Sequence, residues 1–227
     1  MLIKQEGRWC VVCAISSFED EVRVATKNCL ETLLRRAQAI QRELQAEHLT
    51  FSGILPGVME KNDVPHDGQE AQTTVLVVAD AIAKVSAQVG HDEDTPVILL
   101  GASGYIGTRL KVQLQGREVH AVDPKSNQST LPESLRGQCA LLVNVASRRA
   151  LAGHLSALWE GLVLLNEVYP EPSRKERLEL RRMGIPAFHV VGVEATAFPP
   201  FPGAYRGGAP CCAAIPSPGL RAVIQEL

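Results

Sequence analysis

The chain has 227 residues and a formal net charge of -2 at pH 7, a balance that gives no basis for a general affinity for nucleic acid or for an anionic membrane. It has no run of about 18 consecutive apolar residues, and its first residues lack the apolar core of a secretory signal. We therefore expect a cytoplasmic protein with neither a nucleic-acid nor a membrane partner. Its length allows one large domain or two small ones.

The first 92 residues predict one strand and two long helices. Consecutive apolar residues predict a strand over 8–16, and apolar residues at helical spacing predict helices over 17–48 and 69–89. Residues 50–68 contain three glycines and two prolines, which indicates a loop, and loops of that length are often functional. We assign residues 1–92 to a small, mostly helical domain for substrate binding or assembly.

From residue 93 onward, strands and helices alternate, which predicts a parallel sheet with right-handed crossovers. The expected strands are 96–101, 117–123, 139–145, 161–168 and 186–192, and the expected helices are 104–115, 131–136, 148–160, 172–183 and 218–226. The fold class is thus α/β. A Rossmann domain over 93–227 follows the helical N-terminal domain.

A glycine-rich turn follows the first strand of that domain, in the run VILLGASGYIG that ends at Gly107. Gly101 allows the tight turn, Gly104 lets a pyrophosphate approach the backbone, and Gly107 permits close packing of helix on sheet. The helix that starts here offers unpaired N–H groups to an anion. The pattern favours dinucleotide binding, although glycine-rich turns of this kind also occur in Rossmann domains that bind no ligand.

An acidic residue, Asp123, lies 22 positions after Gly101, about the spacing at which a carboxylate meets the adenosine ribose. That carboxylate favours NAD over NADP, since a 2′-phosphate would meet a like charge, and the nearby Lys125 weakens the preference. Asn144 and Ser147 are placed to contact the second ribose, or else only to cap a helix. The predicted cofactor residues are Gly101, Ser103, Gly104, Tyr105, Ile106, Gly107, Asp123, Lys125, Asn144, Ala146 and Ser147.

The order of the two parts resembles the shikimate dehydrogenase-like group and, more loosely, the methylene-tetrahydrofolate and methylene-tetrahydromethanopterin dehydrogenases. The similarity is best over 97–195, where the run NEVYPEPS looks like a strand end of the form D-x-x-Y-x-P. Residues 1–92 depart from the pattern, since Lys61 and Asp63 occupy a comparable loop without the N-V-T-x-P-x-K motif. The resemblance implies an NAD(P)-dependent dehydrogenase and leaves the substrate open.

Hydride transfer usually needs a group that gives or takes a proton. Lys61, Asp63 and His66 lie in the long loop that would face a cleft, although an ordinary solvated loop is the alternative. Glu167 and Tyr169 follow a predicted strand at its carboxyl end, the edge at which such sheets bind ligands, or they serve packing there. The predicted catalytic residues are Lys61, Asp63 and Tyr169.

The cysteines are expected to be reduced thiols. Cys10 and Cys13 form a C-x-x-C inside an apolar run, which favours a packing role. A nucleophile at Cys211 or Cys212 would indicate aldehyde oxidation through a thioester, but no histidine lies beside them in the sequence. The spacings of His, Cys, Asp and Glu predict no metal site.

Together these patterns predict an NAD(P)-dependent oxidoreductase that transfers a hydride to or from a small-molecule substrate held between the two domains. The alternative is a nucleotide-binding regulatory or interaction protein without turnover. The two long amphipathic helices predict a homodimer.

Overall fold

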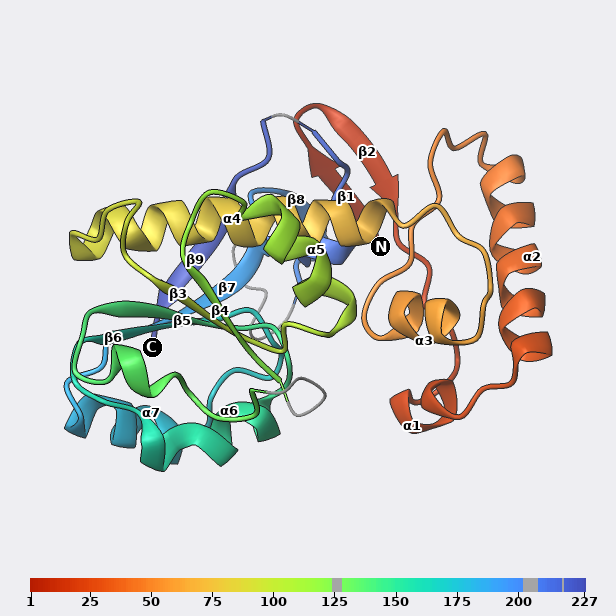
Figure 1. Ribbon diagram of the computed structural model, residues 1–227. Coiled ribbons are helices and arrows are strands. Elements are labelled where there is room, and N and C mark those ends of the chain that lie inside the picture. The colour runs from red at the N-terminus through yellow and green to blue at the C-terminus, as the bar shows by residue number, and fades with distance from the viewer. Residues whose placement is uncertain (124–127, 202–207, 218) are drawn as a thin grey trace.

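The computed structural model describes residues 1–123, 128–201, 208–217 and 219–227. Its centre is a six-stranded sheet in the order β4-β3-β5-β6-β7-β9 (Figure 1). The strands are β3 (Val97–Leu100), β4 (Val119–Val122), β5 (Ala140–Asn144), β6 (Leu162–Asn166), β7 (Ala187–Val193) and β9 (Ala222–Glu226). All neighbours pair in parallel except β7 and β9. The α/β fold class with a Rossmann-like sheet is confirmed.

Helices cover both faces of this sheet (Figure 1). Helices α4 (Gln69–Val89) and α5 (Tyr105–Gln113) lie on one face, and α6 (Arg148–His154) and α7 (Arg174–Arg182) lie on the other. Side chains of β3 alternate between the two faces, as a strand requires: Leu99 packs with α4 and α5, whereas Leu100 packs with the opposite layer. Short 3-10 helices η1 (Glu133–Leu135) and η2 (Leu155–Ala157) complete that layer.

Helix α4 precedes the sheet in sequence and yet belongs to its core. The predicted helix over 69–89 is confirmed, and its apolar side chains Val78, Ile82 and Val85 are buried in one cluster with Leu99 of β3 and Val190 of β7. This helix, which the sequence analysis assigns to the N-terminal domain, therefore covers one face of the large sheet, across β3 and β7.

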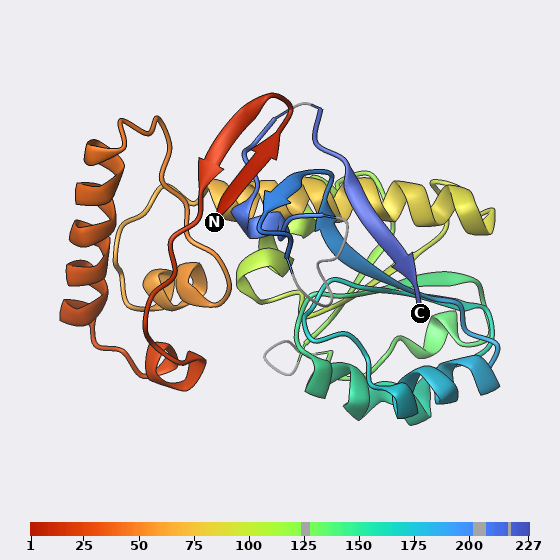
Figure 2. The same ribbon diagram turned by 180° about the vertical axis from the view of Figure 1, so that it is seen from behind.

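The N-terminal strand differs from the prediction. The chain forms a hairpin of β1 (Leu2–Gln5) and β2 (Arg8–Val11) in place of one strand over 8–16, because Glu6 and Gly7 take positive φ values of 49° and 80° and turn the backbone. Strand β8 (Thr196–Phe198) joins β1 to make a second, three-stranded sheet (Figure 2).

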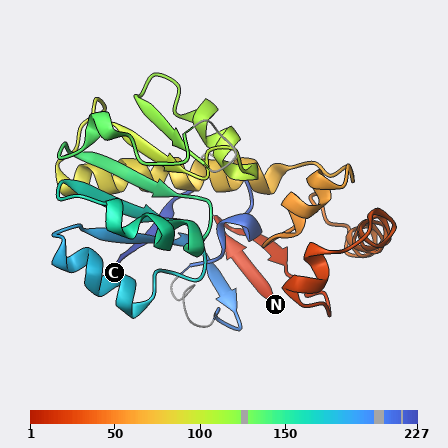
Figure 3. The ribbon, with the colours of Figure 1, turned by 60° about the horizontal axis from the view of Figure 1, so that its bottom comes forward.

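The predicted helix over 17–48 is two helices, α1 (Glu19–Arg23) and α2 (Lys27–Glu43). Thr26 separates them, since its side chain accepts a hydrogen bond from the Cys29 N–H and so starts a new helix. Figure 3 shows α2 nearly end-on, on the side of the molecule away from α6 and α7.

Part of the predicted loop over 50–68 forms helix α3 (Leu55–Lys61). Pro56 lies in its first turn, where proline is favoured. Leu55 and Met59 of α3 pack with Leu30 of α2 in a small core separate from those of the large sheet. Tertiary burial thus orders a segment whose glycines and prolines indicate a loop.

The predicted helix over 218–226 is wrong at its described residues: Ala222–Glu226 form β9, antiparallel to β7. The hydrogen bonds offered by the open edge of β7 and the β-branched pair Val223 and Ile224 outweigh local helix propensity. No helix within the described ranges is long and apolar enough to cross a membrane.

Candidate dinucleotide site and an adjoining thiol cluster

The glycine turn packs β3, α5 and the segment after β5 against one another. Gly101 has φ +97°, and a Cβ there would lie 2.7 Å from the Ala146 Cα. A Cβ on Gly107 would lie 2.1 Å from the Gly101 carbonyl oxygen. Gly104 is the N-cap of α5. Both close approaches exclude any side chain at 101 and 107, so helix α5 starts directly against the end of β3.

This turn lies where the strand order reverses. Strand β3 has β4 on one side and β5 on the other, and in open α/β sheets ligands bind outside the carboxyl ends of the strands at such a switch point. Residue Ser103 is exposed, and Tyr105 and Ile106, which open α5, are half-buried.

Asp123 follows β4 and faces the turn. Its Oδ2 accepts a hydrogen bond from the Ser103 N–H over 3.2 Å, and the residue is 7% exposed. The carboxylate is therefore held at the carboxyl edge of the sheet, one strand from Gly101. Lys125, the other predicted residue of this strand end, lies outside the described residues.

Asn144 ends β5 and is fully buried. Its amide donates to Asn166 Oδ1 over 2.8 Å, and its Oδ1 accepts from the Ala146 N–H over 3.2 Å. Ser147 caps α6, since its Oγ accepts from the Ala150 N–H. Asn144 therefore holds the backbone that touches Gly101, Ser147 starts α6, and Ala146 is exposed beside the turn.

A buried polar cluster joins α5 to α4. The Tyr105 hydroxyl donates to Glu70 Oε1 over 2.8 Å and lies 3.1 Å from His66 Nε2. His66 Nε2 also lies 3.1 Å from Glu70 Oε1, with side chains only 8% and 2% exposed. Burial and the hydrogen bond to Glu70 raise the pKa of Tyr105 well above its usual range. Arg109 stacks 4.2 Å over the Tyr105 ring.

The two ring nitrogens of His66 have different partners. Nδ1 faces the Val64 carbonyl at 3.2 Å, an acceptor only, so Nδ1 carries a hydrogen. Nε2 faces both the Tyr105 hydroxyl and Glu70 Oε1, each at 3.1 Å. The ring therefore joins the loop before α4 to both side chains.

Two thiols lie beside this cluster. The 3-10 helix η4 (Cys211–Ala213) packs against α4. Cys211 Sγ donates to Glu167 Oε1 and accepts from the Thr74 hydroxyl, both over 3.5 Å, and Cys212 Sγ accepts from the Gly53 N–H over 3.5 Å. All six cysteines are free thiols.

Glu167 places these thiols at the carboxyl edge of the sheet. It is the first residue after β6, and its N–H donates to the Asn144 carbonyl. It therefore lies two strands from Gly101. Burial, followed by the nearby Cys212, raises the pKa of Glu167 to about 8. The adjacent Cys211 thiol and then the Gly53 N–H lower the pKa of Cys212 to about 7, against burial, which raises it.

The three predicted catalytic residues are all exposed. Lys61 ends α3, Asp63 follows it with φ 52°, and Tyr169 is 57% exposed two residues beyond Glu167. From the same loop as Lys61, His66 reaches Tyr105. No sequence signal distinguishes Glu70, Thr74 or Arg109. In the case of Glu70, a carboxylate in the first turn of a helix is typical of a solvated residue that interacts favourably with the helix dipole.

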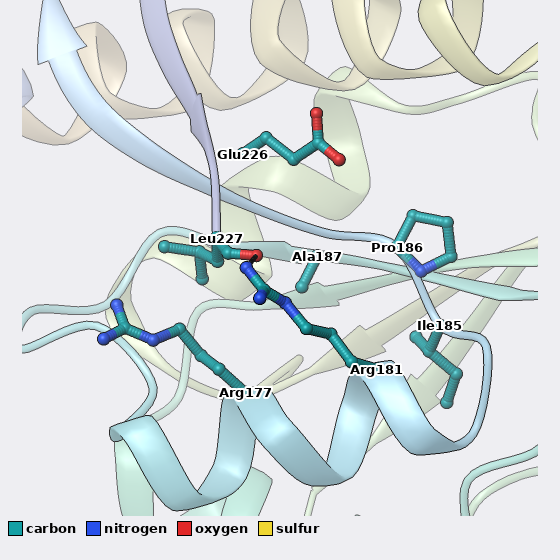
Figure 4. A pocket seen from close by; sticks show the side chains of 7 residues that line it. All are labelled: Arg177, Arg181, Ile185, Pro186, Ala187, Glu226 and Leu227. Carbon is teal, nitrogen blue, oxygen red and sulfur yellow. Dashed lines mark hydrogen bonds between the residues drawn. The ribbon is translucent and has the colours of Figure 1, made fainter.

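A shallow pocket lies elsewhere, at the amino-terminal edge of β7 (Figure 4). Arg177 and Arg181 line it, and Arg181 donates to the Leu227 carbonyl oxygen over 2.9 Å. This edge is opposite to the glycine turn, so the pocket is separate from the candidate site. Within the described part of the chain, no three His, Cys, Asp or Glu side chains gather in a group able to hold a metal ion.

Neither a scan of protein-family models nor a search of curated protein sequences gave a match. A solved structure with a partly similar fold is the NAD+-bound 3-phosphoglycerate dehydrogenase of Entamoeba histolytica, at 17% identity and a TM-score of 0.32. The match covers 51% of this chain and 52% of that one, so the chain spans about half the length of that dehydrogenase.

Proposed function

We propose that the protein is an NAD(P)-dependent oxidoreductase that transfers a hydride between a nicotinamide cofactor and a small-molecule substrate. The observation that carries this proposal is the contact between the Ser103 N–H and Asp123 at the switch point of the sheet. The contact holds the Asp123 carboxylate beside the glycine turn, and this supports a ribose diol at Asp123 and a pyrophosphate at the turn.

The residues present fit a dinucleotide. Gly104 caps α5 without a side chain, which leaves the first N–H groups of the helix open to an anion. Asp123 suits the ribose of NAD better than a 2′-phosphate. When bound, the nicotinamide would supply or accept the hydride.

This chain's own residues would bind and orient the cofactor and move protons. Gly101 and Gly107 shape the turn, Asn144 fixes the segment beside it, and Glu167 stands at the strand end two places along. Glu167 holds a proton at neutral pH and can donate it. Catalytic roles for Lys61, Asp63 and Tyr169 stay predictions, as do the membership in the shikimate dehydrogenase-like group and the homodimer.

A regulatory protein that binds a nucleotide without turnover is the second candidate. The observation in its favour is that His66, Glu70 and Tyr105 engage one another in a buried cluster. A sensor would use that cluster to join the nucleotide turn to α4.

One pair of measurements tests both. We expect NADH or NADPH to raise the melting temperature of the protein, with NADH the more effective. Nicotinamide absorbance is then followed with a panel of aldehydes, oxo acids and imines. No thermal shift with either cofactor overturns the dinucleotide site, and a shift without turnover on any substrate favours the sensor.

A further inference from the structure

The paired cysteines of η4 are arranged unlike ordinary buried thiols. Both are only partly buried, and each faces polar groups from other elements: Glu167 after β6, Thr74 in α4, and the Gly53 N–H before α3. Three separate segments of the chain thus converge on two adjacent sulfur atoms. A packing role requires none of these contacts.

The two sulfur atoms have different surroundings. Cys212 accepts a backbone N–H, which stabilises a thiolate. Cys211 donates to a carboxyl oxygen and accepts a hydroxyl, so it stays a thiol. Among the described residues, the ionisable groups near Cys212 include Cys211, Glu167 and, more weakly, Glu70. Cys212 is therefore the better nucleophile, and Glu167 is the nearby acid.

We propose that Cys212 is a nucleophilic thiolate that adds to the carbonyl carbon of an aldehyde substrate, with Glu167 as the proton donor to the carbonyl oxygen. The proposal deepens the oxidoreductase function and rests on it for the fate of the adduct. The addition itself needs no cofactor.

The step balances without an oxidant. The Cys212 Sγ lone pair forms a bond to carbon, the carbonyl π pair moves to oxygen, and that oxygen takes the proton of the Glu167 carboxylic acid. The product is a thiohemiacetal, and Glu167 is left as a carboxylate. Cys211, the residue next to Cys212, donates to Glu167 directly and so links this acid to the thiol pair.

The hydride chemistry favours an aldehyde over a ketone. The carbon of a thiohemiacetal keeps its hydrogen, which is the hydride that a nicotinamide removes in aldehyde oxidation. A ketone adduct has no such hydrogen. When the hydride is removed, the hydroxyl proton of the thiohemiacetal would return to the Glu167 carboxylate, and the product would be a thioester.

The test follows cysteine alkylation of the whole chain without cofactor. Iodoacetamide modification is measured peptide by peptide from pH 6 to 9, with the exposed Cys13, Cys29 and Cys139 as internal references. We expect the rate at Cys212 to reach its midpoint near pH 7, below that of the references. Propionaldehyde should slow alkylation at Cys212 alone, reversibly on dilution, and acetone should protect less.

Two variants separate the roles. Glu167→Gln should weaken protection by propionaldehyde several-fold and leave Cys212 alkylation fast, because alkylation needs no proton donor. Cys139→Ser is the matched control and should change neither. The proposal is overturned if propionaldehyde gives Cys212 no more protection than Cys139 receives, or if Cys212 shows the pH midpoint of the references.

The same preparation distinguishes the two proposals. Thermal shift by NADH with no aldehyde protection overturns the thiol role and leaves the dinucleotide site. Aldehyde protection with no thermal shift supports the thiol role and overturns the dinucleotide site.

Discussion

The Tyr105 hydroxyl donates a hydrogen bond to Glu70 Oε1 over 2.8 Å, and this contact ties the start of α5 to the start of α4. Tyr105 belongs to the glycine-rich run, whereas Glu70 follows the long loop before α4. Glu70 Oε2 is buried with no hydrogen-bond partner within the described part of the chain. The Tyr105 hydroxyl is therefore an important hydrogen-bond donor to this buried carboxyl group.

Tyr105→Phe should destabilise the protein by roughly 1–3 kcal/mol, the cost of leaving a buried acceptor with one donor fewer. Urea unfolding measures the change in free energy. Glu70→Gln and the double variant complete a cycle, in which we expect a coupling of about 1 kcal/mol. Additive single effects would contradict a direct contact.

Gly107→Ala should unfold or strongly loosen the start of α5, because its Cβ would lie 2.1 Å from the Gly101 carbonyl oxygen. We expect a loss of about 3 kcal/mol or more. Gly153→Ala is the matched control: it lies in α6 with no heavy atom within 4 Å of a Cβ. That change should be neutral or stabilise by roughly 0.5–1 kcal/mol. Equal losses at both positions would rule out the close approach.

Asp123→Ala should reduce the thermal shift by NADH several-fold and reduce that by NADPH less, since removing the carboxylate removes both a ribose acceptor and the like charge near a 2′-phosphate. Asp94→Ala, at an exposed position before β3, is the control. An unchanged ratio of the two shifts would place the adenosine ribose elsewhere.

The raised pKa of Glu167 predicts a pH dependence of stability. Because folded Glu167 holds its proton more tightly than the unfolded chain does, its stabilising contribution is complete below the ordinary value of 4.5 and is lost as the pH rises through about 8. Relative to Glu167→Gln, the native protein should lose roughly 1–3 kcal/mol of unfolding free energy between pH 5 and 9. Urea midpoints across that range measure the difference, and parallel curves would contradict the raised value.

The strand, turn and helix at 97–113 could be predicted because every local signal there agrees: a short apolar run, glycines at fixed spacing and a helical pattern. Leu55–Lys61 could not, because its helix depends on burying Met59 under α2. Ala222–Glu226 likewise depends on an open strand edge that only the assembled sheet provides.

The candidate site also has a part that local sequence predicts and a part that depends on tertiary contacts. The glycines of the turn and Asp123 can be recognised in the sequence by their spacing. The contact between Glu167 and Cys211 could not be predicted, since the two residues are 44 positions apart and meet only at the carboxyl edge of the sheet. A contact between residues so far apart in the chain leaves no periodic pattern in the sequence.

The N-terminal hairpin is attached to a segment from the other end of the sequence. The side chain of Gln5 exchanges two hydrogen bonds with the backbone of Ile215, over 2.8 and 2.9 Å, and β1 pairs with β8. Strand β2 follows β1 directly, whereas β8 comes after most of the large sheet. During synthesis on the ribosome, β1 can therefore pair with β2 early, but the three-stranded sheet can form only after the strands up to β7 have been made.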